Sequence, residues 1–217
     1  NLPRARIRLT ITGGDLSLLS RAGTTDPRDP TVLIAAQPAT VYPAPMFERG
    51  AALVVADARA NPLNPFEGHK TLNYWWRLRE LQMAAAKGAG EALILNVSNH
   101  LVGGCVSNIF LVSGNTLRTP IARGEENSVG GKSALPSPVL PGVTRGWAID
   151  RAEQLGLTVA RQMLAPAEVL EADEVFLTNS SWGVLPIVKF ESSAIGDGVP
   201  GKFAARLRGL WLDQFPA

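Results

Sequence analysis

The chain has 217 residues, of which 46% are hydrophobic and 18% are charged, so it can bury a sizeable core. Its formal net charge of +2 and the absence of a basic stripe with interleaved aromatic residues argue against nucleic acid as a partner. No apolar run approaches the roughly 20 residues that span a bilayer, and the start has no signal-peptide pattern, so we expect no membrane partner. Cys105 is the only cysteine, which excludes an internal disulfide and favours a reducing, cytoplasmic compartment.

The N-terminal part of the sequence is typical of the end of a small domain followed by a linker. Arg6–Thr12 and Thr31–Pro38 are rich in β-branched and other apolar residues and are predicted strands. The stretch PATVYPAP, residues 38–45, contains three prolines and is typical of a linker. We therefore expect residues 1–44 to be the C-terminal part of a small domain plus the linker, and residues 45–217 to form a larger domain.

The larger domain mixes predicted strands and helices. A buried strand is expected at Ala51–Asp57. A helix is expected from Leu72 to Lys87, because this stretch contains no glycine or proline and Gly88 can end it. Its apolar face is predicted to contain alanines together with Leu72, Trp75, Trp76, Leu78 and Met83. The further expected elements are a strand at 91–97, a hairpin at 108–120, a helix at 142–156, strands at 174–181 and 183–190, and a closing helix at 201–215. This order indicates a mixed α/β fold.

Several short motifs do not indicate a function. The GGKS stretch, Gly130–Ser133, is not a phosphate-binding loop, because Glu126 occupies the place of the required glycine. The segment around it, Ile121–Val139, is rich in glycine, serine and proline and is predicted to be a surface loop. His69 and His100 are far apart and lack the cysteine or acidic neighbours of a metal site, so no metal is expected.

Six sequence fragments, each weak by itself, occur in a defined order and spacing: HKTLNYW, GAGEALILN, GGCVSNIFLVSGNTLRTP, LPGVTR, ADEVFLTNSSWGVLPI and GVPGKFAARL. Together they resemble the class IV aminotransferase family, the fold-type IV pyridoxal-phosphate enzymes. That family includes branched-chain and D-amino-acid aminotransferases and aminodeoxychorismate lyase. The resemblance implies a partial small α/β domain followed by a larger barrel-like α/β domain of the D-amino-acid aminotransferase type. It also implies a homodimer.

Lys70 is the catalytic residue that this resemblance implies. Taken alone, it would be an exposed charge next to a helix start. In the family, the lysine at this place forms a Schiff base with pyridoxal 5'-phosphate. Its amine must lose a proton before it attacks the cofactor's aldehyde, which burial near other cationic groups favours. Once released by the substrate's amine, the lysine can carry the proton between the substrate's Cα and the cofactor's C4′.

The resemblance also implies a phosphate site. In LPGVTR, Gly142 allows close approach of the backbone, and Val143 and Thr144 open a helix whose free N–H groups and dipole suit a dianion. Taken alone, this stretch is an ordinary helix start with Thr144 as its cap. Ser180 and Ser181 are expected to close the other side of the site with hydroxyl and backbone N–H groups.

Three further cofactor-binding positions are implied by the resemblance. Asn108 is expected to orient the backbone around the cofactor, and Tyr74 either reaches the cofactor's phenolic oxygen or is a core residue. Gly103 stands five residues before Asn108, where family members carry a glutamate that keeps the pyridine nitrogen protonated. NHLVGGCVSN contains no acid, so the nearest replacements are neutral: Ser107, Cys105 and His100. We therefore predict that Gly103→Glu raises transamination.

The N-terminal part also departs from the family pattern. Relatives carry additional strands, with an arginine for the cofactor's phosphate, ahead of the stretch that Asn1–Pro38 resembles. Gly13–Asp15 stands where relatives often place an arginine for the substrate carboxylate, and neither Arg21 nor Arg28 is assigned to that role. The leading function is a pyridoxal-phosphate-dependent aminotransferase acting on an amino acid. The alternatives are a carbon–carbon lyase of the aminodeoxychorismate type, with an amino-chorismate substrate, and a degenerate member without turnover.

Overall fold

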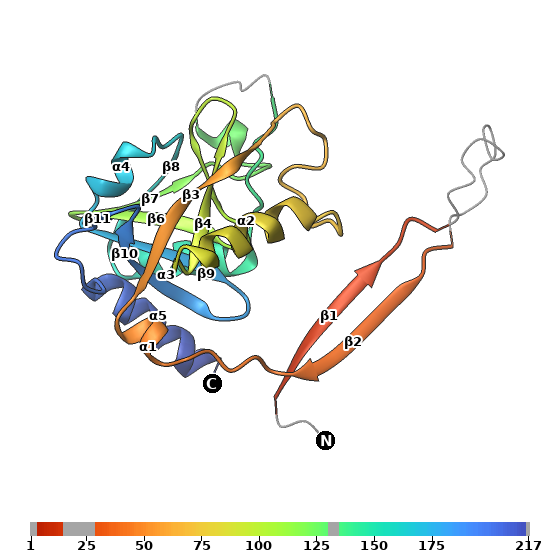
Figure 1. The fold of residues 1–217 in the computed structure, drawn as a ribbon, viewed down its shortest axis with the longest axis horizontal. Coiled ribbons are helices and arrows are strands. Elements are labelled where there is room, and N and C mark those ends of the chain that lie inside the picture. The colour runs from red at the N-terminus through yellow and green to blue at the C-terminus, as the bar shows by residue number, and fades with distance from the viewer. Residues whose placement is uncertain (1–3, 15–28, 130–134, 216–217) are drawn as a thin grey trace. The chain divides into compact units, whose positions relative to one another are not determined.

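The computed structural model of the chain describes residues 4–14, 29–129 and 135–215 (Figure 1). The chain divides into two compact units, Asn1–Tyr42 and Pro43–Ala217. Four features of the sequence lie outside the described residues: Asp15, Arg21, Arg28 and the GGKS motif.

In the first unit, the described residues form an antiparallel pair of strands, β1 (Ala5–Ile11) and β2 (Val32–Pro38). Residues that lie opposite each other in such a pair point to the same face of the sheet, as Leu9 and Ile34 do here. The register therefore places Ile7, Leu9 and Ile11 on the same face as Val32 and Ile34, whereas Leu33 lies on the other face. All of these side chains are exposed.

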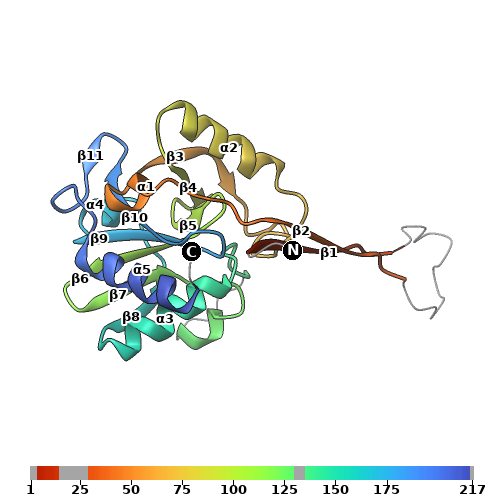
Figure 2. The ribbon, with the colours of Figure 1, turned by 90° about the horizontal axis from the view of Figure 1, so that it is seen from below.

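In the described part of the second unit, nine strands form one curled, half-barrel sheet (Figures 1 and 2). The strands are β3 (Ala51–Ala60), β4 (Glu91–Asn96), β5 (Leu101–Gly104), β6 (Asn108–Ser113), β7 (Thr116–Pro120), β8 (Thr158–Gln162), β9 (Glu174–Asn179), β10 (Gly183–Phe190) and β11 (Ser193–Ala194). Their order across the sheet is β5-β4-β3-β10-β9-β6-β7-β8, with β11 paired to β10. The β3–β4, β3–β10 and β7–β8 pairs are parallel and the others are antiparallel. The expected mixed α/β fold with a barrel-like larger domain is confirmed.

Helices cover the sheet (Figure 2). They are α1 (Pro45–Glu48), α2 (Trp75–Ala86), α3 (Val143–Gln154), α4 (Ala167–Leu170) and α5 (Lys202–Gln214), with a 3-10 turn η1 (Glu126–Val129). Helix α2 packs on β3 and β4, whereas α3 packs on β8 and β9, and α5 on β9 and β10. The core accordingly contains one hydrophobic cluster beneath α2 and another beneath α3 and α5, where the rings of Phe110 and Phe176 stack with centroids 5.0 Å apart.

The predicted apolar face of α2 is observed only in part: Ala84 is in the hydrophobic cluster beneath the helix and Trp76 packs against it. Trp75 is 73% exposed and Leu78 is 42% exposed, whereas the residues that α2 buries are Glu80 and Ala84. Glu80 is buried because its carboxylate accepts a hydrogen bond of 2.8 Å from the backbone N–H of Asp57 on β3. The inner side of this helix thus combines apolar packing with a polar contact, and hydrophobic periodicity does not reveal the polar contact.

Candidate active site

Helix α3 begins with an open N-terminus. Gly142 precedes the helix with an extended backbone (φ −67°, ψ 141°), and no side chain caps the helix. Because the first N–H groups of a helix have no partner within it, they are available to an anion. The hydroxyl of Thr144, in the first turn, lies 3.4 Å from the hydroxyl of Ser180, just after β9, while the side chain of Val143 is exposed. The fold therefore gathers two hydroxyl groups beside this helix start.

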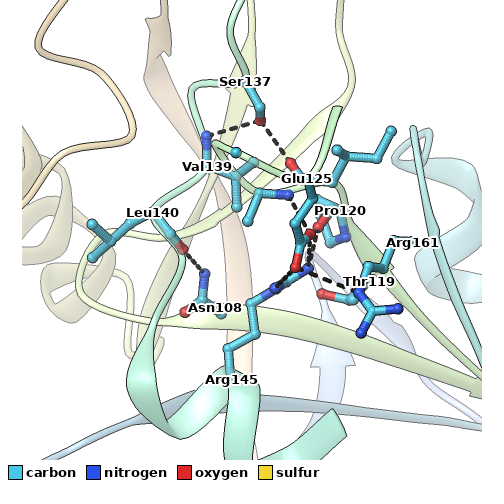
Figure 3. A network of polar contacts seen from close by, with 12 residues as sticks. Asn108, Thr119, Pro120, Glu125, Ser137, Val139, Leu140, Arg145 and Arg161 are labelled. Carbon is cyan, nitrogen blue, oxygen red and sulfur yellow. Dashed lines mark hydrogen bonds and ion pairs between the residues drawn. The ribbon is translucent and has the colours of Figure 1, made fainter. Parts of the chain in front are cut away.

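Asn108 holds the segment that leads into α3 (Figure 3). It opens β6, and its Nδ2 donates a hydrogen bond of 2.8 Å to the carbonyl of Leu140. Its Oδ1 lies so close to Gly142 that a Cβ on residue 142 would stand 2.2 Å from it. Opposite Asn108 on β9 lies Thr178, whose buried Oγ1 has no hydrogen-bond partner within the described residues. Thr178 was missed in the sequence, although it immediately precedes Asn179 and the two serines.

The turn between β9 and β10 contains Ser181, which is exposed. Asn179 organises this turn, because its Oδ1 accepts hydrogen bonds from the backbone N–H groups of Ser181 and Trp182 at 2.9 and 3.0 Å. Its Nδ2 donates to the carbonyl of Val106 at 3.3 Å, which ties the turn to the one between β5 and β6. Asn179 is thus a second residue of this region that the sequence did not single out.

Gly103 lies buried on β5 with a φ of +150°, a conformation that favours glycine. A Cβ there would stand 2.7 Å from the carbonyl oxygen of Ser107. A glutamate at residue 103 therefore requires the backbone to move. The packing around residue 103 therefore argues against the prediction that Gly103→Glu raises transamination.

A carboxylate does reach this turn, from β4. Glu91 is fully buried, and it accepts hydrogen bonds from the backbone N–H groups of Ala92, Cys105 and Val106 and from the hydroxyl of Ser107, at 3.1 to 3.4 Å. Burial raises the pKa of Glu91, and these hydrogen bonds oppose the rise. Burial, and next the charge of Glu91, raise the pKa of the Cys105 thiol. Glu91 thus clamps the turn rather than offering a free acid, and Cys105 is an unreactive packing residue.

Lys70 lies in the loop between β3 and α2. Its Nζ donates a hydrogen bond of 3.2 Å to the hydroxyl of Tyr74 and stands 4.3 Å from the centre of that ring. Lys70 is exposed, so the expectation that it is buried near other cationic groups is wrong. It forms no ion pair with any residue that the structure describes. Within the part of the chain that the structure describes, the hydroxyl of Tyr74 is thus the hydrogen-bond partner of an exposed amine.

Two further features are absent from the residues that the structure describes. No three or more histidine, cysteine, aspartate or glutamate side chains gather there in a way that could hold a metal ion. None of the helices in that part of the chain has the length and apolar character needed to cross a membrane.

Comparison with known proteins identifies the family. The sequence model described as Amino-transferase class IV matches residues 1–190, so the chain belongs to the class IV aminotransferase family. The branched-chain-amino-acid aminotransferase of Escherichia coli (strain K12) is 29% identical over 220 residues, covering 99% of this chain and 66% of that enzyme. The family resemblance of the six sequence fragments is confirmed.

Solved structures of two kinds are similar. The Escherichia coli branched-chain aminotransferase matches with a TM-score of 0.79 at 28% identity, over 97% of this chain and 66% of that one. The 4-amino-4-deoxychorismate lyase from Pseudomonas aeruginosa matches with a TM-score of 0.78 at 26% identity, over 97% and 72%. A T.th. branched-chain aminotransferase with pyridoxamine 5'-phosphate matches with a TM-score of 0.72 at 28% identity, over 84% and 56%. Class IV aminotransferases are pyridoxal-phosphate enzymes, and this chain spans about two thirds of the Escherichia coli relative.

Proposed function

We propose that this chain supplies the cofactor-binding domain of a pyridoxal-phosphate-dependent aminotransferase that acts on an amino acid. The observation that carries the proposal is the environment of the Lys70 amine. In a chain of this family, its amine is exposed, has no ion pair with any described residue, and lies within hydrogen-bonding distance of the Tyr74 hydroxyl. Such an amine is open to a carbonyl group, and Tyr74 orients it.

The N-terminal end of α3 fits the phosphate of the cofactor. The open helix start offers the N–H groups of Val143 and Thr144, and the hydroxyls of Thr144 and Ser180 lie beside it. Thr178 on β9, whose hydroxyl has no hydrogen-bond partner among the described residues, offers a third hydroxyl. Backbone N–H groups and hydroxyls at a helix start suit a dianion. We therefore assign Gly142, Val143, Thr144 and Ser180 to phosphate binding, with Asn108 holding the turn and Ser181 completing the far side.

The chemistry then divides between cofactor and protein. When bound, pyridoxal phosphate supplies an electron sink for the charge that develops at the substrate's Cα. Lys70 would hold the cofactor through its amine, and the same amine would accept or donate the proton at the substrate's Cα. Tyr74 accepts a hydrogen bond from Nζ and so holds the amine in place.

A spectroscopic experiment tests this assignment. The protein is mixed with pyridoxal phosphate, its visible absorbance is recorded, and borohydride reduction followed by peptide mapping locates the attached cofactor. We expect a visible band and a modification on Lys70, and we expect Lys70→Ala to lose both. Lys87→Ala is the matched control, because Lys87 is also exposed and lies at the other end of α2. A band that persists in Lys70→Ala contradicts the proposal.

A lyase of the aminodeoxychorismate type is the second candidate, and the similarity to the Pseudomonas aeruginosa lyase favours it. Aminodeoxychorismate cleavage and amino-group transfer from branched-chain amino acids should be assayed on the same preparation. Cleavage without transfer replaces the aminotransferase by the lyase. The absence of a carboxylate at Gly103 favours a third candidate, a member that holds the cofactor without turnover. Cofactor uptake with neither activity supports that candidate.

We also propose that the protein is a homodimer. All five tryptophans lie in the described residues, and Trp75 is the exposed one, while the other four are half-buried. Trp75 is thus the one tryptophan with a largely exposed side chain. Other exposed large apolar side chains lie in the same stretch of chain: Leu63, Phe66, Leu72 and Leu78. Large exposed apolar patches are typical of interfaces, so we expect these side chains to contact a second copy of the chain. Light scattering at micromolar concentration tests the proposal, and a monomer contradicts it.

A further inference from the structure

The segment from Ile121 to Val139 follows β7 and leads to α3. Its composition predicts a surface loop, but part of it is buried. Ala122 and Val139 are buried in the core, and the backbone N–H of Arg123 donates to the carbonyl of Val139 at 2.9 Å. The two ends of the segment are therefore paired with each other. Arg123 and Glu125 project from its first part, and each contacts a different piece of the candidate active site.

Arg123 holds the loop that carries Lys70. Its Nε and Nη2 both donate to the carbonyl oxygen of Glu67, at 3.0 and 2.7 Å. The side chain of Glu67 is itself paired with Arg77 on α2 at 2.9 Å. Gly68 packs so tightly here that a Cβ on it would lie 2.7 Å from the carbonyl of Ser137 and 2.9 Å from Nε of Arg123. The backbone just before Lys70 is thus fixed from two sides.

Glu125 holds the first turn of α3 (Figure 3). Its two carboxylate oxygens accept hydrogen bonds from Nη1 and Nη2 of Arg145, both at 2.7 Å. The side chain of Arg145 is only 2% exposed, and its Nη2 also donates to the carbonyl of Pro120 at 3.0 Å. A paired, two-point contact of this kind fixes geometry as well as contributing energy. Since Arg145 follows Thr144 directly, Glu125 fixes the turn assigned to the phosphate.

We propose that Arg123 and Glu125 are positioning residues of the cofactor site, an inference that rests on the proposed function. Arg123 fixes the Lys70 loop, and Glu125 fixes the phosphate-binding turn of α3. The two residues are separated only by Gly124, so a single short stretch of chain connects the amine and the phosphate-binding turn. Neither residue touches the cofactor in this scheme.

Two ligands distinguish the role of Arg123 from the role of Glu125. They are pyridoxal phosphate and pyridoxal, which lacks the phosphate. The full chain is titrated with each and followed by visible absorbance. In metal sites, partners that orient a ligand-holding side chain contribute about 10–100-fold in affinity. By analogy we expect Glu125→Gln to weaken pyridoxal phosphate on the order of tenfold and to leave pyridoxal within about twofold. Inorganic phosphate, used as a competitor, should lose affinity to the same extent as pyridoxal phosphate.

Arg123→Met is expected to behave differently. It removes both hydrogen bonds to Glu67 while keeping a long apolar stem. The affinities for pyridoxal and pyridoxal phosphate should fall by the same factor, and reduction by borohydride should attach less of either to Lys70. Competition by inorganic phosphate should be unchanged.

Glu168→Gln provides a matched control. Glu168 pairs with Arg118 at 2.7 Å, as Glu125 does with Arg145, and the two carboxylate side chains are 25% and 24% exposed. Each glutamate also accepts a backbone N–H three residues earlier in the chain. We expect Glu168→Gln to leave the ratio of the two dissociation constants unchanged, which separates positioning from general stability.

The outcomes are distinct. An unchanged ratio in folded Glu125→Gln, or an altered ratio in Arg123→Met, overturns the inference and leaves the proposed function intact. If Glu125→Gln fails to fold, the shorter carboxylate of Glu125→Asp is read in the same way. A wild-type protein that takes up neither pyridoxal phosphate nor pyridoxal overturns the proposed function and this inference with it.

Discussion

Gly142→Ala provides a test of the contact that shapes the start of α3. Gly142 has φ −67° and ψ 141°, which any residue adopts without strain, so its backbone conformation does not require glycine. The limited space beside residue 142 does require glycine, because a Cβ would lie 2.2 Å from Oδ1 and 3.4 Å from Cγ of Asn108. Relieving the overlap requires a movement of about 1 Å, given ordinary non-bonded separations. The amide of Asn108 is the group that can move.

The cost follows from what Asn108 does. Its displacement breaks the hydrogen bond to the carbonyl of Leu140 and leaves a buried amide short of a partner. A lost hydrogen bond costs about 0.5–1.5 kcal/mol, and an unsatisfied buried polar group about 1–3 kcal/mol. We therefore expect Gly142→Ala to lower the free energy of unfolding by about 2 kcal/mol. Asn108→Ala should lower it by about 1–2 kcal/mol, because it removes the same hydrogen bond without a clash.

The double variant makes the test sharp. Without the Asn108 side chain, the methyl group that Gly142→Ala adds meets no amide, so the double variant should cost no more than Asn108→Ala alone. The expected coupling is about 2 kcal/mol, measured by urea unfolding of the four proteins in a double-mutant cycle. All five tryptophans lie between residues 75 and 211, so their fluorescence reports on the larger unit. Additive costs would refute the reasoning.

Three further predictions concern buried or paired groups. Glu91→Gln should lower the free energy of unfolding by about 1–3 kcal/mol, since its amide N–H₂ would face N–H and O–H donors; an unchanged urea midpoint contradicts this. Gly103→Glu should lower the melting temperature and bring no gain in transamination, because of its φ and the nearby carbonyl; a faster, equally stable variant contradicts this. Burial alone would raise the pKa of Glu125, but hydrogen bonds from Arg145 and the backbone hold it below its ordinary value. Its stabilisation is present above the unfolded pKa, about 4.3, and is lost as pH falls through the folded pKa. The stability difference between wild type and Glu125→Gln should shrink in acid, and a pH-independent difference contradicts this.

Much of the fold could be predicted from the sequence, because its elements carry local signals. The apolar runs at β3, β4, β6 and β10 and the glycine-bounded helices α3 and α5 were expected within a few residues of their observed bounds. Two short strands were not predicted. The first, β5 (Leu101–Gly104), contains two glycines, and the second, β8 (Thr158–Gln162), contains two polar residues and an arginine. Such strands form because neighbouring strands pair with them in the sheet, and the residues of the strand itself do not indicate that pairing.

In the candidate site, too, some residues could be predicted from local sequence and others could not. Lys70, Asn108, Gly142 and Thr144 were predicted as site residues from short fragments that occur in the family's order. The partners that organise them were missed, because each is far away in the chain: Glu91 reaches the turn after β5, and Glu125 reaches α3.

The physical reason is that sequence patterns record local preferences, namely backbone conformation, periodicity and turn chemistry. Whether Lys70 is buried or exposed, and whether a glutamate fits at Gly103, depends on which atoms from other elements occupy the neighbouring space. Only tertiary packing decides that. The sequence by itself determined the family and the order of the longer elements, and it pointed to Lys70 as a candidate; the tertiary structure decided which charged residues contact the Lys70 loop and the start of α3.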